Sequence, residues 1–255
     1  MQLQEIKGWL FDLDGVIWAG EDPMPGAADL VAALRKAGRQ VAFLSNNSGA
    51  TAESLAQRIG QFGIMAETKD VISPIAAAGR YLAERYGKVK VLASGLPALA
   101  AVLAESGHTP VTDPYAAEAV VMGRNYEFTY DSLTTICRAV DRGIPFLALN
   151  KDARLPVEGG AWVPGLGAMV AAVVAATGRE PLVVGKPSRL LFDTALAYLG
   201  TAPGETVMVG DTPAADIAGG RNAGMWTIKV GNAAGEPEAH WQVSDPAELL
   251  RLWQA

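Results

Sequence analysis

Two carboxylates lie close together near the N-terminus, directly after a short apolar run. Residues 9–11 are apolar, and Asp12, Asp14 and Gly15 follow them. Such a run is typical of a buried strand in a parallel sheet, and open α/β sheets bind their ligands at the carboxyl ends of strands. Because two acids at this spacing repel each other, we expect a cation beside them, most simply Mg²⁺. An Asp-Gly turn after a strand is also common, so the interpretation depends on the rest of the chain.

Polar residues also follow three later apolar runs, at 40–44, 181–184 and 206–209. They are Ser45, Asn46 and Asn47 after the first run, Lys186 after the second, and Asp211 with Asp216 after the third. Taken singly, each has an ordinary explanation as a turn, a surface lysine or an acid in the first turn of a helix. All of them together, on one parallel sheet, favour phosphate chemistry.

The residue types suggest a division of labour. Asp12, Asp211 and the backbone carbonyl of Asp14 could coordinate Mg²⁺ beside a phosphate oxygen. Ser45 with nearby backbone N–H groups, and Lys186 with its charge, could hold the remaining phosphate oxygens. Asp12 could then attack phosphorus as a covalent nucleophile, while Asp14 protonates the leaving group and later takes a proton from water. The expected site also includes Asn46 as a phosphate contact and Asp216, Asn47 and Gly15 as supporting residues.

Composition narrows the classes of partner. The chain has 255 residues, of which 50% are hydrophobic, enough for one large core or two modest ones. A net charge of -6 without a basic tract argues against a nucleic-acid polymer as partner. Cys137 is the only cysteine, which suits a reducing cytosol. No signal sequence is recognisable, and the apolar run 166–176 is too short to span a bilayer. We therefore expect a cytoplasmic protein, without membrane association, that acts on a small phosphorylated metabolite.

Strand and helix patterns alternate almost throughout, which predicts an α/β fold with a parallel sheet covered by helices. The expected strands are 8–12, 40–44, 88–93, 119–122, 145–149, 181–184, 206–209 and 225–230. The expected helices are 27–37, 51–62, one from 73, 96–105, 130–142, 165–177, 188–199, 214–224 and a short one after Asp245. No flexible linker marks a domain boundary.

Taken together, these motifs resemble the haloacid dehalogenase (HAD) superfamily of phosphatases. The resemblance rests on Asp12-x-Asp14-Gly15, Ser45, Lys186 and Gly210-Asp211 with Asp216. Further phrases resemble its NagD-like branch, namely Phe128-Thr129-Tyr130, Pro164-Gly165-Leu166-Gly167-Ala168, Ala176-Thr177-Gly178 and Gly185-Lys186-Pro187-Ser188. The resemblance implies a Rossmann-like core at 1–80 and 181–255. It also implies an inserted C2-type α/β cap at 81–180, which would exclude water and select the substrate.

The resemblance also implies a substrate class. Family members hydrolyse phosphate monoesters such as nucleoside monophosphates, sugar phosphates, phosphoglycolate and p-nitrophenyl phosphate. In the cap, Asn125, Tyr126 and the loop 150–158 with Asn150 are the expected substrate contacts, and a homodimer through the cap is expected. Two positions depart from the family pattern: Ala215 replaces a threonine, and Asn125 stands where many relatives have aspartate.

Other activities of the same fold fit less well. Dehalogenases lack a second carboxylate in the first motif, so Asp14 favours phosphoryl chemistry. Phosphomutases carry a small helical cap after that motif, where this chain has only the short loop 17–26. A nucleotide- or phosphometabolite-binding regulatory module remains the alternative, with weak support from Gly165-x-Gly167. Trp18, four residues after Asp14, could line the site entrance or simply pack.

Overall fold

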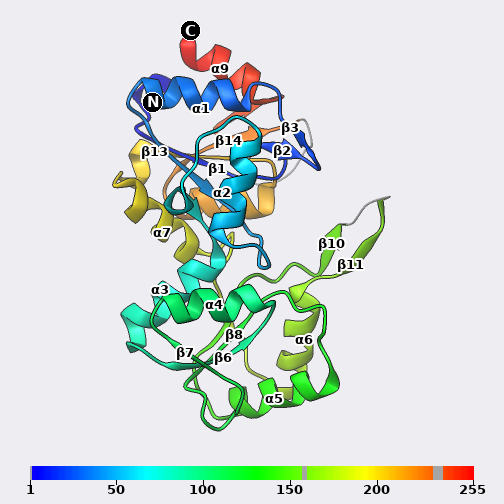
Figure 1. Ribbon diagram of the computed structural model, residues 1–255. Helices are drawn as coiled ribbons and strands as arrows, with labels where there is room; N and C mark the ends of the chain where they lie inside the picture. Colours follow the sequence, from blue (N-terminus) through cyan, green and yellow to red (C-terminus); the bar gives the residue numbers. More distant parts are fainter. Residues whose placement is uncertain (1, 157–159, 232–237) are drawn as a thin grey trace. The chain divides into compact units, whose positions relative to one another are not determined.

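The computed structural model describes residues 2–156, 160–231 and 238–255 (Figure 1). The chain divides into two compact units. Unit 1 takes residues up to 45, 52–72 and 186–255, and unit 2 takes 46–51 and 73–185. The end of the loop 150–158, expected to contact substrate, lies outside the described residues.

A six-stranded, all-parallel sheet forms the centre of unit 1, in the order β15-β14-β13-β1-β4-β5. Its strands are β1 (Gly8–Phe11), β4 (Gln40–Leu44), β5 (Val71–Ile72), β13 (Thr206–Gly210), β14 (Trp226–Val230) and β15 (Trp241–Val243). Every residue of β1 is buried, as expected for a central strand covered on both faces. β1 pairs with β13 and β4, so the carboxyl ends of these three strands adjoin at one edge of the sheet.

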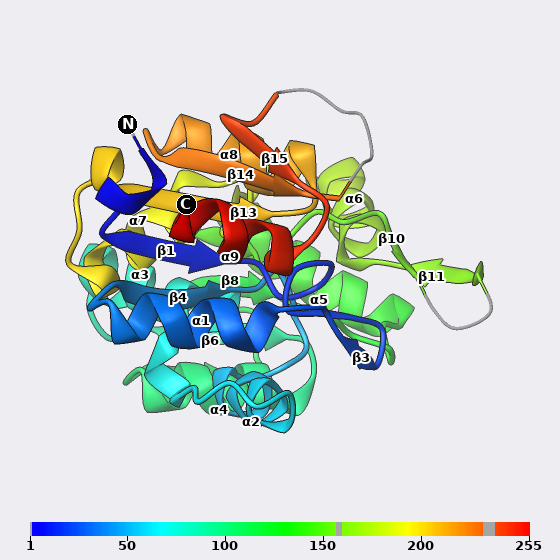
Figure 2. The same cartoon turned by 90° about the horizontal axis from the view of Figure 1, so that it is seen from above.

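Helices complete unit 1. They are α1 (Ala27–Lys36), α2 (Ala52–Gln61), α7 (Arg189–Leu199), α8 (Ala218–Asn222) and α9 (Pro246–Gln254), with the short turns η1 (Leu3–Glu5), η2 (Thr68–Asp70), η4 (Pro203–Glu205) and η5 (Pro213–Ile217). α1 packs beside α9, and α7 packs beside α8 (Figure 2). Local capping explains where two of them begin: the side chain of Ser188 accepts a bond from the N–H of Leu190, and that of Asp245 from the N–H of Glu248. A small hairpin, β2 (Trp18–Ala19) and β3 (Asp22–Pro23), follows the first motif.

Unit 2 has its own parallel sheet, in the order β12-β9-β8-β6-β7. Its strands are β6 (Lys90–Ser94), β7 (Thr109–Val111), β8 (Ala119–Met122), β9 (Phe146–Ala148) and β12 (Leu182–Val183), and its helices are α3 (Pro74–Tyr86), α4 (Pro97–Glu105), α5 (Tyr130–Asp141) and α6 (Leu166–Thr177). α3 packs on α4, and α5 on α6. An antiparallel hairpin of β10 (Arg154–Pro156) and β11 (Trp162–Pro164) also belongs to this unit (Figure 1).

The structure differs from the sequence predictions in a few elements. The two-residue β5, the three-residue strands β7 and β15, and both hairpins were not expected, because such short runs carry no clear periodicity. The single helix expected over 214–224 is instead the π-helical turn η5 followed by α8. Among the described residues, no helix is both long enough and apolar enough to cross a membrane.

The ionisation of Tyr198, on α7, should affect the stability of unit 1 at alkaline pH. Its hydroxyl donates to Asp70, which also pairs with Arg35 at 3.3 Å. Burial and the bond to the Asp70 carboxylate raise the pKa of Tyr198 to about 12, above the value of about 10 in an unfolded chain. The folded state therefore favours the neutral phenol. Its contribution to stability is complete below about pH 10 and disappears as the pH rises through the folded-state pKa.

We expect Tyr198→Phe to lower the free energy of unfolding by about 0.5–1 kcal/mol near pH 8, the usual worth of one hydrogen bond. The variant should also lose stability less steeply than wild type between about pH 10 and 12. Urea unfolding at several pH values measures both effects. Tyr130→Phe is the control, because the Tyr130 side chain is 83% exposed. Equal alkaline slopes for wild type and Tyr198→Phe would contradict the prediction.

Candidate active site

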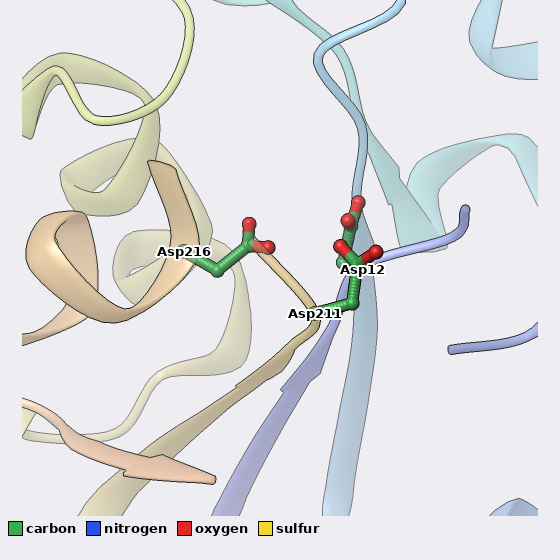
Figure 3. Close-up of side chains that lie close together, drawn as sticks. All are labelled: Asp12, Asp211 and Asp216. Carbon is green, nitrogen blue, oxygen red and sulfur yellow. The ribbon is translucent and has the colours of Figure 1, made fainter. Parts of the chain in front are cut away.

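Three carboxylates meet at the carboxyl edge of the unit 1 sheet (Figure 3). Asp12 follows β1, Asp211 follows the neighbouring strand β13, and Asp216 lies in η5. One carboxylate oxygen from each lies within 4.8 Å of the others. Asp216, expected only as a supporting residue, is completely buried, and Asp12 is 7% exposed. The cluster is therefore built into the core of unit 1 rather than spread over a solvated surface.

Lys186 lies between two of these acids. Its Nζ is 2.7 Å from Oδ1 of Asp12 and 2.6 Å from Oδ1 of Asp216, and the lysine is almost fully buried. Burial alone would lower the pKa of Lys186, but the charges of Asp12 and Asp216 outweigh it and raise that pKa. The ammonium therefore stays protonated and supplies positive charge next to Asp12.

The same cluster has an excess of negative charge. Burial and the neighbouring Asp216 raise the pKa of Asp12 to about 8, although Lys186 opposes the shift. Burial also raises the pKa of Asp211. Fully ionised, three carboxylates face one ammonium, which leaves an imbalance that a divalent cation would neutralise. The all-oxygen donor set is the kind that Mg²⁺ and Ca²⁺ prefer, so the residues fit a divalent metal ion.

Two glycines allow the acids to approach each other. Gly15 has φ +79°, and a Cβ atom there would lie 2.4 Å from Oδ2 of Asp211. A Cβ atom on Gly210 would lie 2.2 Å from Cβ of Asp216. Both contacts are far shorter than van der Waals separations, so any larger residue would displace a member of the cluster. This gives Gly15, expected as a supporting residue, a physical reason to be glycine.

Asp14 does not join the three-carboxylate cluster. Its carboxylate is exposed, and Oδ1 accepts a hydrogen bond of 2.7 Å from the indole Nε1 of Trp18. Trp18 is 1% exposed, so its ring packs in the core of unit 1 instead of standing free. The expected metal ligand from Asp14, its backbone carbonyl, stays a prediction.

The segment after β4 is held by its own hydrogen bonds. Ser45 is 2% exposed, and its N–H donates to the carbonyl of Ile72 at 3.2 Å. Oδ1 of Asn47 accepts bonds from the N–H groups of Gly49 and Ala50, at 2.9 and 3.1 Å. Asn47 therefore shapes this turn, and its supporting role at the site stays a prediction.

Asn150 is buried and makes a hydrogen bond within unit 2. It is 2% exposed, and its Nδ2 donates to the carbonyl of Asn46 at 3.0 Å. The side chain therefore holds the turn at Asn46, and a contact between Asn150 and substrate stays a prediction. Tyr126 is 66% exposed, and Oδ1 of Asn125 accepts from the N–H of Glu127 at 2.9 Å. For Asn125 and Tyr126, contact with substrate stays a prediction, as does the phosphate contact of Asn46.

Arg124, which follows β8 by two residues, was not among the expected site residues. Its side chain lies against Gly49, where an added Cβ atom would be 3.3 Å from Cδ of Arg124. Its Nε is buried and has no hydrogen-bond partner in the described part of the chain, and Nη1 lies 3.4 Å from the hydroxyl of Tyr126. A charged residue soon after the buried strand 119–122 was the available signal. Arg124 and the turn 46–51 belong to the same unit.

A parallel Rossmann-like sheet whose carboxyl edge holds a buried lysine between Asp12, at a strand end, and Asp216, in η5, suits a phosphate-handling α/β hydrolase. Known protein families and relatives support this class. The sequence pattern of the haloacid dehalogenase-like hydrolases matches residues 9–109, and a related HAD hydrolase pattern matches 183–250. The 5'-nucleotidase YutF of Bacillus subtilis is 32% identical over 228 residues, which cover 89% of this chain and 88% of that protein.

Solved structures show the same relationship. The p-nitrophenyl phosphatase of Archaeoglobus fulgidus matches with a TM-score of 0.91 and 30% identity, covering 96% of this chain and 98% of that one. The glycerol phosphate phosphatase Rv1692 of Mycobacterium tuberculosis, solved in complex with magnesium, matches with a TM-score of 0.87 and 30% identity, covering 99% of this chain and 78% of that one. The chain belongs to the haloacid dehalogenase-like hydrolases, in their NagD-like phosphatase branch, and is a phosphoric monoester hydrolase.

Proposed function

We propose that the protein is a Mg²⁺-dependent phosphatase that hydrolyses small phosphate monoesters through a phosphorylated Asp12. The proposal rests on the residues that surround Asp12. Its carboxylate is buried, contacts the ammonium of Lys186 at 2.7 Å, and lies beside two further acids at the end of the central strand. A nucleophile must be an oriented, ionised carboxylate, and the nearby ammonium of Lys186 favours ionisation of Asp12 against the opposite effect of burial.

The residues divide the reaction as follows. Asp12 attacks phosphorus, forming an acyl-phosphate bond as the bond from phosphorus to the ester oxygen breaks, and Asp14 gives its proton to that departing oxygen. Asp14 then takes a proton from the water that attacks the phosphorylated Asp12, which releases orthophosphate. Ser45 and Lys186 hold phosphate oxygens during both steps. A bound Mg²⁺, held by Asp12, Asp211 and the carbonyl of Asp14, would neutralise charge on the phosphate oxygens.

A phosphate-release screen tests this proposal. Its substrates are nucleoside monophosphates, sugar phosphates, glycerol phosphate, phosphoglycolate and p-nitrophenyl phosphate, each with Mg²⁺ and with EDTA. The relatives named for nucleotides, p-nitrophenyl phosphate and glycerol phosphate support this choice. Release that depends on Mg²⁺ is expected. If no substrate released phosphate, the proposal would fail in favour of a phosphometabolite-binding module.

The metal ligands can be tested at Asp211. Asp211→Asn should raise the Mg²⁺ concentration for half-maximal activity by about 10- to 100-fold, because one charged ligand becomes neutral. A Mg²⁺ titration with p-nitrophenyl phosphate measures the shift. Asp193→Asn, which removes only the exposed pair with Arg189, is the control. An unchanged Mg²⁺ requirement in Asp211→Asn would exclude Asp211 as a ligand.

We propose that unit 2 is the cap and selects the substrate, and that Arg124 favours esters with a second anionic group. The Arg124 guanidinium lies beside the turn 46–51 and the exposed hydroxyl of Tyr126, and its charge suits a carboxylate or phosphate on the substrate. Homodimer formation through this unit stays a prediction.

We expect Arg124→Leu to raise the KM for phosphoglycolate by about tenfold or more, the worth of one charged hydrogen bond. The KM for p-nitrophenyl phosphate, which has no second anion, should change less than about threefold. Steady-state kinetics on both substrates measure the contrast. Arg138→Leu is the matched control, because Arg138 is exposed on α5. Equal changes for the two substrates would contradict the assignment.

A further inference from the structure

A short loop holds Asp14 through both its backbone and its side chain. The N–H of Gly15 donates to the carbonyl of Trp18 at 2.7 Å, and the N–H of Trp18 donates to the carbonyl of Leu13 at 3.2 Å. The indole Nε1 of Trp18 then donates to Oδ1 of Asp14 at 2.7 Å. A four-residue turn therefore places one indole N–H directly on the carboxyl group of Asp14.

The indole ring is itself held in place. It is 1% exposed, lies 5.7 Å from the ring of Phe62, and has the guanidinium of Arg58 at 4.5 Å from its centroid. Arg58, on α2, also donates to the carbonyl of Gly20 in the same loop. Because a cation over a buried indole face is attractive, α2 restrains the ring that orients Asp14. Such support is what a group needs to keep a productive orientation.

The hydrogen bond distinguishes the two oxygens of Asp14. An indole N–H is a donor only, so the oxygen that it contacts must accept and cannot carry a proton on that side. We propose that Trp18 is a positioning residue that reserves Oδ1 of Asp14 as an acceptor, so that Oδ2 carries the transferred proton. This inference rests on the proposed function. The proton passes from Oδ2 to the ester oxygen as the bond between phosphorus and that oxygen breaks, and Oδ2 later takes a proton from the attacking water.

Kinetics with two kinds of leaving group test the inference. Trp18→Phe keeps an aromatic ring beside Arg58 but removes the N–H. We expect kcat for glycerol phosphate, whose alkoxide must be protonated, to fall about 10- to 100-fold. For p-nitrophenyl phosphate, whose leaving group needs little protonation, kcat should fall less than about threefold, with KM unchanged for both. Equal losses on the two substrates, or none, would overturn the inference.

The matched control is Trp9→Phe. Trp9 is also completely buried, but its Nε1 has no hydrogen-bond partner among the described residues. The substitution therefore removes a similar ring volume without removing a bond to a carboxylate. We expect Trp9→Phe to change the turnover of both substrates by the same factor. A leaving-group contrast as large as that of Trp18→Phe would overturn the inference, because lost ring volume would then explain both variants.

A second measurement does not depend on turnover or on the folding of a tryptophan variant. In ¹⁵N-labelled protein, the indole N–H proton of Trp18 should resonate downfield of that of Trp9, because only the former is bonded to a carboxylate. Asp14→Ala should move the Trp18 resonance upfield and leave that of Trp9 in place. An unmoved Trp18 resonance would overturn the inference. The proposed function would fail separately, if Asp12→Asn kept wild-type turnover.

Discussion

Asp12→Asn should reduce turnover of p-nitrophenyl phosphate by roughly a thousandfold or more, because an amide oxygen cannot form the covalent intermediate. The same substitution should stabilise the protein in EDTA at neutral pH. Burial and Asp216 raise the pKa of Asp12 to about 8, so the folded state favours the neutral acid. That contribution to stability is complete below about pH 4 and disappears as the pH rises through the folded-state pKa. Because an amide does not ionise, the Asp12→Asn variant should not lose this stability as the pH rises.

Two measurements check this pair of effects. A p-nitrophenyl phosphate assay with Mg²⁺ gives the turnover, and urea unfolding in EDTA between about pH 5 and 9 gives the stability. Asp193→Asn, at an exposed acid on α7, serves as the control for both. Wild-type turnover in Asp12→Asn would show that Asp12 is not the nucleophile. A steeper loss of stability with rising pH than in wild type would contradict the charge balance inferred for the cluster.

Lys186→Met should cost both activity and stability. Removal of the ammonium leaves Asp12 and Asp216 buried without their counter-ion, since both contact its Nζ at under 3 Å. Breaking a buried pair in this way costs about 3–5 kcal/mol of unfolding free energy. Turnover should fall about 100-fold or more, because one fixed charge on the phosphate oxygens is lost. Urea unfolding in EDTA and a phosphatase assay measure the two effects.

A double variant separates the two roles of Lys186. Lys186→Met with Asp216→Asn removes the ammonium together with one of the carboxylates, so part of the lost stability should return while activity stays low. Lys151→Met is the matched control. It breaks only the exposed pair of Lys151 with Glu180, which is worth about 1 kcal/mol or less. If Lys186→Met were as stable as this control, the cluster would not depend on the ammonium.

Local sequence patterns were enough to place the elements that carry the site. The strand ending at Asp12 follows from a buried apolar run. Three of the expected helices begin at Ser73, Ser188 and Asp245, whose side chains accept bonds from backbone N–H groups of the first turn. Because parallel strands present their carboxyl ends at one edge, the meeting of Asp12 and Asp211 could be expected from strand order alone. Each of these inferences depends on residues close together in the chain.

The partners of the individual side chains, by contrast, depend on tertiary packing. The unexpected turn η5 places Asp216 in the acidic cluster. Asp14 lies outside that cluster and accepts a hydrogen bond from Trp18. Arg124 meets the turn at Gly49, which is remote in sequence. Such contacts depend on backbone path and rotamer, which distant residues determine through packing. The residue types and their order were therefore enough to predict the chemistry available at the strand ends. The packed fold decided which oxygen, nitrogen and charge face one another.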